Sequence, residues 1–191
     1  MKIILASQSP RRKELLKLVV PNFETIVSNT DEHLIEGISN EEQAMQVSYQ
    51  KAKSVFDITT GDRIVIGSDT MVVKNNKIYG KPKNKENAKD IIKELLSGDK
   101  THNIITGLSI ISEINGVIEI HNTYDTVKIF FKDISDNEID NWINTGKAMD
   151  KAAAYSVQDD FCVHIEKIEG NYQSAMGLPI HKVYDILKDN L

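Results

Sequence analysis

The chain has 191 residues, of which 40% are hydrophobic and 27% are charged, as in an ordinary globular protein. Its formal net charge of −5 argues against non-specific binding to nucleic acid, because phosphates require a basic surface. No apolar run approaches the roughly 20 residues of a membrane span, and the N-terminal sequence has no signal-peptide pattern. We therefore expect a cytoplasmic protein with neither a membrane partner nor a stable nucleic-acid partner.

The first predicted elements are a strand, a tight turn and a helix. An apolar run at residues 3–5 precedes the segment Ser-Gln-Ser-Pro-Arg-Arg-Lys at residues 7–13, and apolar residues at helical spacing follow. Ser9 suits the N-cap position and Pro10 the first helical position. The turn would then aim backbone N–H groups, serine hydroxyls and guanidinium groups at one point, which favours a bound phosphate. An ordinary capped helix with solvated basic side chains is the alternative.

Helical and strand patterns alternate along the rest of the chain, without a linker or an internal repeat, which predicts the α/β class and a single domain over residues 1–191. Further strands are expected at residues 23–27, 63–67, 71–73, 78–79, 104–112, 117–131 and 161–168. Hairpin turns are expected at Asn75-Asn76 and Asn115-Gly116, helix caps at Asn40, Asn84 and Ser135, and a last helix from about Ile180. The only cysteine, Cys162, is expected in the core of the last strand and leaves no intrachain disulfide and no cysteine-based metal site.

Two acidic positions are the first candidates for chemistry. Asp69 follows the buried strand at 63–67, so we expect its carboxylate at a strand end on the rim of the sheet, where α/β sites form. An Asp that only stabilises a turn is the alternative. Asp31 and Glu32 form an acidic pair in a polar loop. Because Mg²⁺ prefers carboxylate oxygens together with water and substrate phosphate, the two positions could share a divalent cation; a solvated acidic loop is the alternative.

Two lysines could contact phosphate. Lys81 stands between Gly80 and Pro82, and Lys51 lies on the helix predicted after Asn40. For either, a free surface lysine is the alternative. The histidines show no two-histidine metal spacing, and the sequence has neither the phosphate-binding P-loop nor the dinucleotide fingerprint. The pattern therefore excludes a P-loop NTPase and a recognisable Rossmann dehydrogenase.

A series of short segments, in this order, resembles the Maf family of nucleoside triphosphate pyrophosphatases along nearly the whole chain. The segments are ASQSPRR at 6–12, DE at 31–32, KA at 51–52, GSDT at 67–70, GKP at 80–82, LSG at 96–98, TG at 106–107, DKA at 150–152, YSVQ at 155–158 and GLP at 177–179. The resemblance implies hydrolysis of a nucleoside triphosphate to the monophosphate and pyrophosphate. It also implies a homodimer and a fold similar to that of inosine triphosphate pyrophosphatase, an elongated mixed sheet flanked by helices with two lobes around a cleft.

The same resemblance favours the branch that acts on dTTP and UTP, because Thr70 follows the acid and the pattern Tyr-x-x-Gln ends at Gln158. It makes Arg12, Thr70 and Gln158 the specificity positions. The amide of Gln158 offers a donor and an acceptor, which match the edge of a pyrimidine. Ala153 stands where the family usually has glycine. If that position requires a positive φ, alanine adds strain of ~1 kcal/mol.

The resemblance and the chemistry of the residues together give an expected site. Asp69, Glu32 and Lys81 are the expected catalytic residues, and Asp69 and Glu32 would bind Mg²⁺ or Mn²⁺. Asp69 would accept the proton of the attacking water or orient the water through the metal. The expected substrate-binding residues are Ser7, Ser9, Arg11, Arg12, Lys51, Thr70 and Gln158. The alternatives are a nucleotide-binding regulator of septum formation without turnover, and a pyrophosphatase for noncanonical purines, modified pyrimidines or 7-methyl-GTP.

Overall fold

The structure is a computed structural model that describes residues 1–30 and 35–190. The predicted acidic pair Asp31 and Glu32 therefore lies outside the described residues. Among the helices that are described, none is both long enough and apolar enough to cross a membrane.

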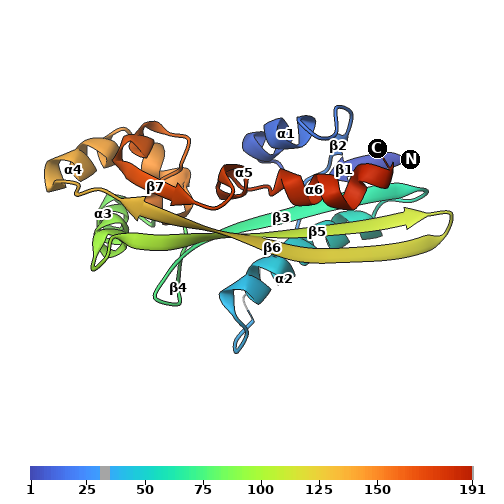
Figure 1. Ribbon diagram of the computed structural model, residues 1–191, viewed down its shortest axis with the longest axis horizontal. Coiled ribbons are helices and arrows are strands. Elements are labelled where there is room, and N and C mark those ends of the chain that lie inside the picture. Colours follow the sequence, from blue (N-terminus) through green and yellow to red (C-terminus); the bar gives the residue numbers. More distant parts are fainter. Residues whose placement is uncertain (31–34, 191) are drawn as a thin grey trace. The chain divides into compact units, whose positions relative to one another are not determined.

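The strands form a seven-stranded mixed sheet in the order β2-β1-β3-β5-β6-β7, with β4 paired to β3 (Figure 1). β1 is parallel to β2 and β3, whereas β4 and β7 are antiparallel to β3 and β6. The strands are β1 Lys2–Leu5, β2 Glu24–Thr25, β3 Arg63–Lys74, β4 Lys77–Tyr79, β5 Thr101–Ile114, β6 Val117–Phe131 and β7 Ile165–Glu169. The α-helices are α1 Pro10–Lys17, α2 Asn40–Asp57, α3 Lys85–Leu96, α4 Asp136–Asn144, α5 Tyr172–Met176 and α6 Ile180–Leu187. These elements confirm the predicted α/β class, with a mixed sheet flanked by helices.

The chain divides into two compact units. Unit 1 consists of Met1–Thr70, Thr106–Asp125 and Gln173–Leu191, and unit 2 consists of Met71–Ile105 and Thr126–Tyr172. The long strands β3, β5 and β6 contribute residues to both units.

In unit 1, helices cover both faces of the sheet: α1 and α6 lie on one side of the strands and α2 lies on the other (Figure 1). Alternate residues of a strand point to opposite faces. Leu5 and Ile66 accordingly belong to the core cluster with α1 and α6, whereas Ile4 and Val65 belong to the cluster with α2. Burial of both faces explains the nearly continuous apolar sequence of β3 up to Ile66 and holds its backbone rigidly there.

Several local predictions are confirmed. The turns at Asn75-Asn76 and Asn115-Gly116 have positive φ at every turn residue and join β3 to β4 and β5 to β6. The side chains of Asn84 and Ser135 cap α3 and α4 as predicted. The cap of α2 differs by one residue from the predicted Asn40. The side chain of Ser39 accepts the backbone N–H of Glu42, and the side chain of Glu42 accepts the backbone N–H of Ser39.

The strand predicted for residues 161–168 of unit 2 is confirmed only in its second half. Residues 160–164 form a 3₁₀ turn, and β7 begins only at Ile165. Cys162, predicted in a strand core, is exposed. The backbone N–H of Cys162 donates to the carbonyl of Asp159 at 2.8 Å, and this local bond replaces a strand partner.

His102 lies in an aromatic cluster of unit 2, against Phe131 and Tyr155. It is 3% exposed, and its burial, followed by the charge of Lys74, lowers its pKa from 6.5 to about 3. The unfolded chain therefore binds one more proton than the native protein between these two pH values. Because protonation then favours unfolding, stability is lost as the pH falls from about 6.5, by up to about 1.4 kcal/mol per pH unit.

We expect His102→Gln to flatten this acid dependence. Between about pH 6.5 and pH 4.5, the free energy of unfolding measured with urea should fall by about 2 kcal/mol more for the wild-type protein than for the variant. His121→Gln is the matched control, because His121 is exposed and should leave the wild-type dependence in place. Parallel curves for wild-type protein and His102→Gln would contradict the assignment.

Candidate functional site

The turn between β1 and α1 is built as the sequence predicts. Ser9 is the N-cap of α1, Pro10 follows at the start of the helix, and the Ser9 side chain accepts the backbone N–H of Arg12 at 3.5 Å. Ser7 Oγ accepts the backbone N–H of Ser9 at 3.2 Å. Both hydroxyls act as acceptors in these contacts and hold the turn that carries Arg11 and Arg12.

Arg12 is fixed by three acceptors within unit 1. Its Nε donates to the Gly177 carbonyl at 2.8 Å, its Nη2 to Thr70 Oγ1 at 3.2 Å and its Nη1 to Ser7 Oγ at 3.5 Å. The predicted specificity positions Arg12 and Thr70 are therefore in direct contact. Arg11 lies on the first turn of the same helix and is half-buried.

Asp69 is paired with Lys51. Lys51 Nζ donates to Asp69 Oδ1 at 2.5 Å, and their side chains are only 14% and 11% exposed. The expected strand end is wrong, because β3 continues through Asp69 to Lys74. It is β1 that ends: Leu5 pairs with Ile66, so Asp69 lies on β3 beyond the last paired residue of β1.

Two glycines allow α2 to bring Lys51 to the sheet. A Cβ at Gly67 of β3 would lie 2.3 Å from the Ser48 carbonyl oxygen, and a Cβ at Gly107 of β5 would lie 2.1 Å from the Ala44 carbonyl oxygen. No side chain fits at either position, so the backbone of α2 rests directly on these strands. Lys51, three residues after Ser48, is thereby held beside Asp69.

Two further polar residues of this group are not predicted from the sequence. Ser68 Oγ lies 2.9 Å from the carbonyl oxygens of both Gly107 and Gly177, and Thr106 Oγ1 lies 3.1 Å from Thr70 Oγ1. Ser68 and Thr106 are fully buried. Their presence in segments that carry the family resemblance was the available signal, but the pattern gave no reason to assign them a role.

Lys81 and Gln158 belong to unit 2. Both are exposed, and the backbone N–H of Ala153 donates to the Gly80 carbonyl at 2.9 Å, which brings their two segments together. Ala153 has φ 54°, so the condition under which alanine adds strain at this position is met. The backbone N–H of Gln158 donates to Ser156 Oγ at 3.3 Å. Glu32 is outside the described residues, and its predicted role stays a prediction.

The donor set at Asp69 fits a hard divalent cation in part. Its carboxylate is the ligand type that Mg²⁺ and Mn²⁺ prefer, and one oxygen already contacts the ammonium of Lys51. In residues 1–30 and 35–190, no group of three or more His, Cys, Asp or Glu side chains is arranged to hold a metal. Asp69 would therefore need Glu32 or the phosphates of the substrate as further ligands.

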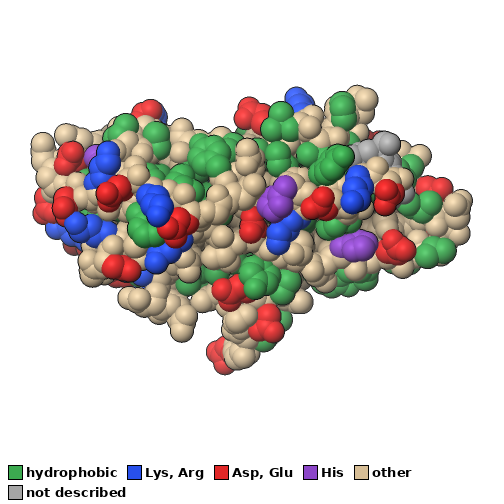
Figure 2. Space-filling model, in the orientation of Figure 1, with side chains coloured by type: hydrophobic (Ala, Val, Ile, Leu, Met, Phe, Trp, Pro, Cys, Tyr) green, Lys and Arg blue, Asp and Glu red, His purple; other side chains and the backbone are tan. Residues whose placement is uncertain are grey.

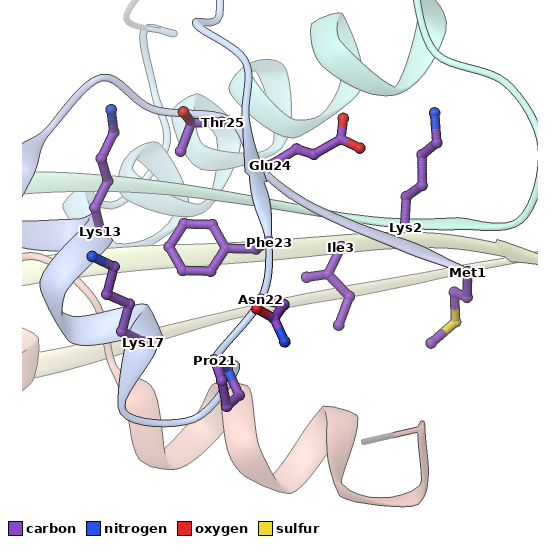
Figure 3. Close-up of a pocket in the computed structure, with 10 residues that line it drawn as sticks. All are labelled: Met1, Lys2, Ile3, Lys13, Lys17, Pro21, Asn22, Phe23, Glu24 and Thr25. Carbon is purple, nitrogen blue, oxygen red and sulfur yellow. The ribbon is translucent and has the colours of Figure 1, made fainter.

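An open cavity of about 540 Å³ lies elsewhere in unit 1, at the N-terminal end of β1 (Figure 3). Its lining includes Lys2, Lys13, Lys17, Phe23 and Glu24 and contains no predicted site residue. In Figure 3, Lys13 and Lys17 lie on one side of Phe23 and Lys2 on the other, so the ammonium groups do not converge on one point. On the face drawn in Figure 2, basic and acidic side chains are interspersed, without a continuous basic stripe.

Comparisons with known proteins give the same family as the sequence motifs. A protein of Alkaliphilus metalliredigens named dTTP/UTP pyrophosphatase is 42% identical over 186 residues, which cover 97% of this chain and 94% of that protein. A protein of Lachnoclostridium phytofermentans with the same name is 41% identical over 187 residues, 97% of this chain and 93% of that protein.

Among solved structures, the Ham1 protein of Staphylococcus aureus matches with a TM-score of 0.49 and 15% identity over 100% of both chains. The family model described as Maf-like protein matches residues 2–190. This match and the identity to the two relatives leave one conclusion: the chain belongs to the Maf-like protein family.

Proposed function

We propose that this protein is a nucleoside triphosphate pyrophosphatase that hydrolyses dTTP and UTP to the monophosphate and pyrophosphate. The observation that carries the proposal is the arrangement of Asp69, held by Lys51, next to Thr70, which accepts from Arg12. Hydrolysis of a polyphosphate requires a carboxylate that acts on the attacking water and cationic groups that neutralise the phosphate charge. Relatives of about 40% identity that are named dTTP/UTP pyrophosphatase support the choice of substrate.

In the proposed reaction, a water oxygen attacks the α-phosphorus while the bond from that phosphorus to the bridging oxygen of the β-phosphate breaks. Pyrophosphate leaves, and Asp69 accepts the proton of the attacking water or, as a ligand of a bound metal ion, would orient that water. Lys51 donates to one carboxylate oxygen of Asp69, and this contact fixes the orientation of the other carboxylate oxygen. Mg²⁺ or Mn²⁺, bound by Asp69 and Glu32, would neutralise phosphate charge.

The remaining predicted residues would bind the substrate. Arg11, Arg12 and Lys81 would neutralise the phosphates, and the Ser7 and Ser9 hydroxyls would donate hydrogen bonds to them. Gln158 would select the pyrimidine, because its side-chain amide can both donate and accept at the edge of the base, and Thr70 is a further specificity position that the family resemblance implies. Lys81 and Gln158 come from unit 2.

The cellular role proposed is that of a cytoplasmic homodimer that removes pyrimidine nucleotides from the pool or restrains septum formation. The competing functions are a nucleotide-binding regulator of septum formation without turnover and a pyrophosphatase for noncanonical purines or 7-methyl-GTP. The first competitor gives no reason for the nearly buried pair of Asp69 and Lys51, since binding alone needs no acid.

The test is pyrophosphate release from dTTP, UTP, CTP, the canonical purine triphosphates, ITP and 7-methyl-GTP, with Mg²⁺, with Mn²⁺ and with a chelator. We expect release from dTTP and UTP to exceed release from the others, and the chelator to abolish it. Faster release from ITP or 7-methyl-GTP would overturn the substrate assignment, and nucleotide binding without any release would favour the regulator. Sedimentation of the same preparation tests the homodimer.

A further inference from the structure

Thr106 of β5 occupies the centre of a buried hydrogen-bond group in unit 1. Its side chain is fully buried, and its Oγ1 lies 2.8 Å from the Ser174 carbonyl oxygen and 3.1 Å from Thr70 Oγ1. Its two partners lie on separate segments, one on β3 and one on α5.

The Thr106 hydroxyl has two contacts, and the shorter one, 2.8 Å to the Ser174 carbonyl oxygen, decides the direction of both bonds. A hydroxyl has one hydrogen, and a carbonyl oxygen can only accept. When Thr106 donates to the Ser174 carbonyl, its oxygen must accept from the Thr70 hydroxyl, and Thr70 in turn accepts from Arg12 Nη2. The result is a chain of donation from Arg12 through Thr70 and Thr106 to Ser174, in which each bond polarises the next.

The acceptor end of this chain is anchored independently of Thr106. Ser174 Oγ donates to Asp125 Oδ2 at 2.5 Å, and the Ser174 carbonyl also accepts the backbone N–H of Gly177 at 3.0 Å. The carbonyl of Gly177 accepts from Arg12 Nε at 2.8 Å, which ties the same loop to the guanidinium group. The loop therefore provides a fixed acceptor against which the Thr106 hydroxyl is oriented.

We propose that Thr106 is a positioning residue for substrate discrimination: it holds the Thr70 hydroxyl in the orientation that presents Thr70 and Arg12 to the nucleotide. The inference rests on the proposed function, in which these two residues contact the substrate. If the Thr106 hydroxyl only stabilised the fold, its removal would change kcat/KM by the same factor for every substrate. A hydroxyl that orients Thr70 changes the ratio between substrates, because discrimination depends on correctly paired polar groups in the site.

Thr106→Val removes the hydroxyl and keeps the shape of the side chain, and Thr106→Ser keeps the hydroxyl. We expect Thr106→Val to lower the ratio of kcat/KM for dTTP over that for CTP by about tenfold, and Thr106→Ser to leave it within about twofold. The Ser174 carbonyl keeps its bond from Gly177, so the valine variant should fold. Thermal unfolding of both variants checks this.

A double-mutant cycle links the effect to Thr70. In a Thr70→Val background, Thr106→Val should not change the ratio further, because the hydroxyl that it orients is already gone. Equal loss of kcat/KM on every substrate, an unchanged ratio, or independent effects of the two substitutions would overturn the inference while leaving the proposed function intact. No hydrolysis by the wild-type protein would instead overturn the proposed function and the inference with it.

Discussion

Asp69→Asn is expected to lower kcat for dTTP by a factor of about 10² to 10⁴, the usual contribution of a group that moves a proton in the transition state. Asparagine has nearly the same volume and can still accept from Lys51 Nζ, which lies 2.5 Å from Asp69 Oδ1 in the wild-type protein. It cannot take up the proton of water, and it is a poor ligand for a divalent cation. The KM should change far less than kcat, and pyrophosphate release under single-turnover and steady-state conditions measures both.

The substitution also removes one ion pair, and this effect needs its own control. Asp57→Asn is matched to it, because Asp57 pairs with Lys53 at 2.5 Å on α2, the same helix that carries Lys51, and is exposed. Asp57→Asn should retain full turnover. Near-normal turnover in Asp69→Asn would exclude Asp69 as the catalytic carboxylate, and a comparable loss in both variants would mean that turnover responds to the loss of any ion pair with a lysine of α2.

Gly107→Ala is expected to destabilise the protein by about 3 kcal/mol or more, at the upper end of the range for overpacked cores. The new Cβ would lie 2.1 Å from the Ala44 carbonyl oxygen and 2.8 Å from the Met45 nitrogen, so α2 must move away from β5. For a chain of this length the Tm should fall by about 6–12 °C. Because α2 carries Lys51 to Asp69, turnover by the folded fraction should fall as well.

Gly80→Ala provides the matched control in thermal unfolding. A Cβ at Gly80 meets no atom within 4 Å, and this glycine does not have a positive φ. Its Tm should stay within about 3 °C of the wild-type value, equivalent to about 1 kcal/mol. A Gly107→Ala protein as stable as the Gly80→Ala protein would contradict the close approach of α2 to the sheet.

Sequence reading succeeded where neighbouring residues decide the conformation. The cap at Ser9, the cap at Asn84 and the hairpin turn at Asn75-Asn76 depend on side chains within three residues of the backbone that they shape, and all three are confirmed. It failed for the first half of the strand predicted at 161–168, because pairing with β6 begins only at Ile165 and the residues before it close a local turn.

The features of the candidate site also fall into those that the sequence predicts and those that depend on the tertiary structure. The sequence by itself determined the family and the chemical groups of the candidate site, since the short motifs and their order can be recognised without knowledge of the fold. Only the tertiary structure decided that Asp69 lies inside β3, that Lys51 rather than a neighbour in sequence holds it, and that Thr106 and Gly177 complete the contacts of Thr70 and Arg12. The physical reason is separation along the chain: Arg12 and Gly177 are 165 residues apart, and their contact depends on helices packed against both faces of one sheet rather than on any local preference.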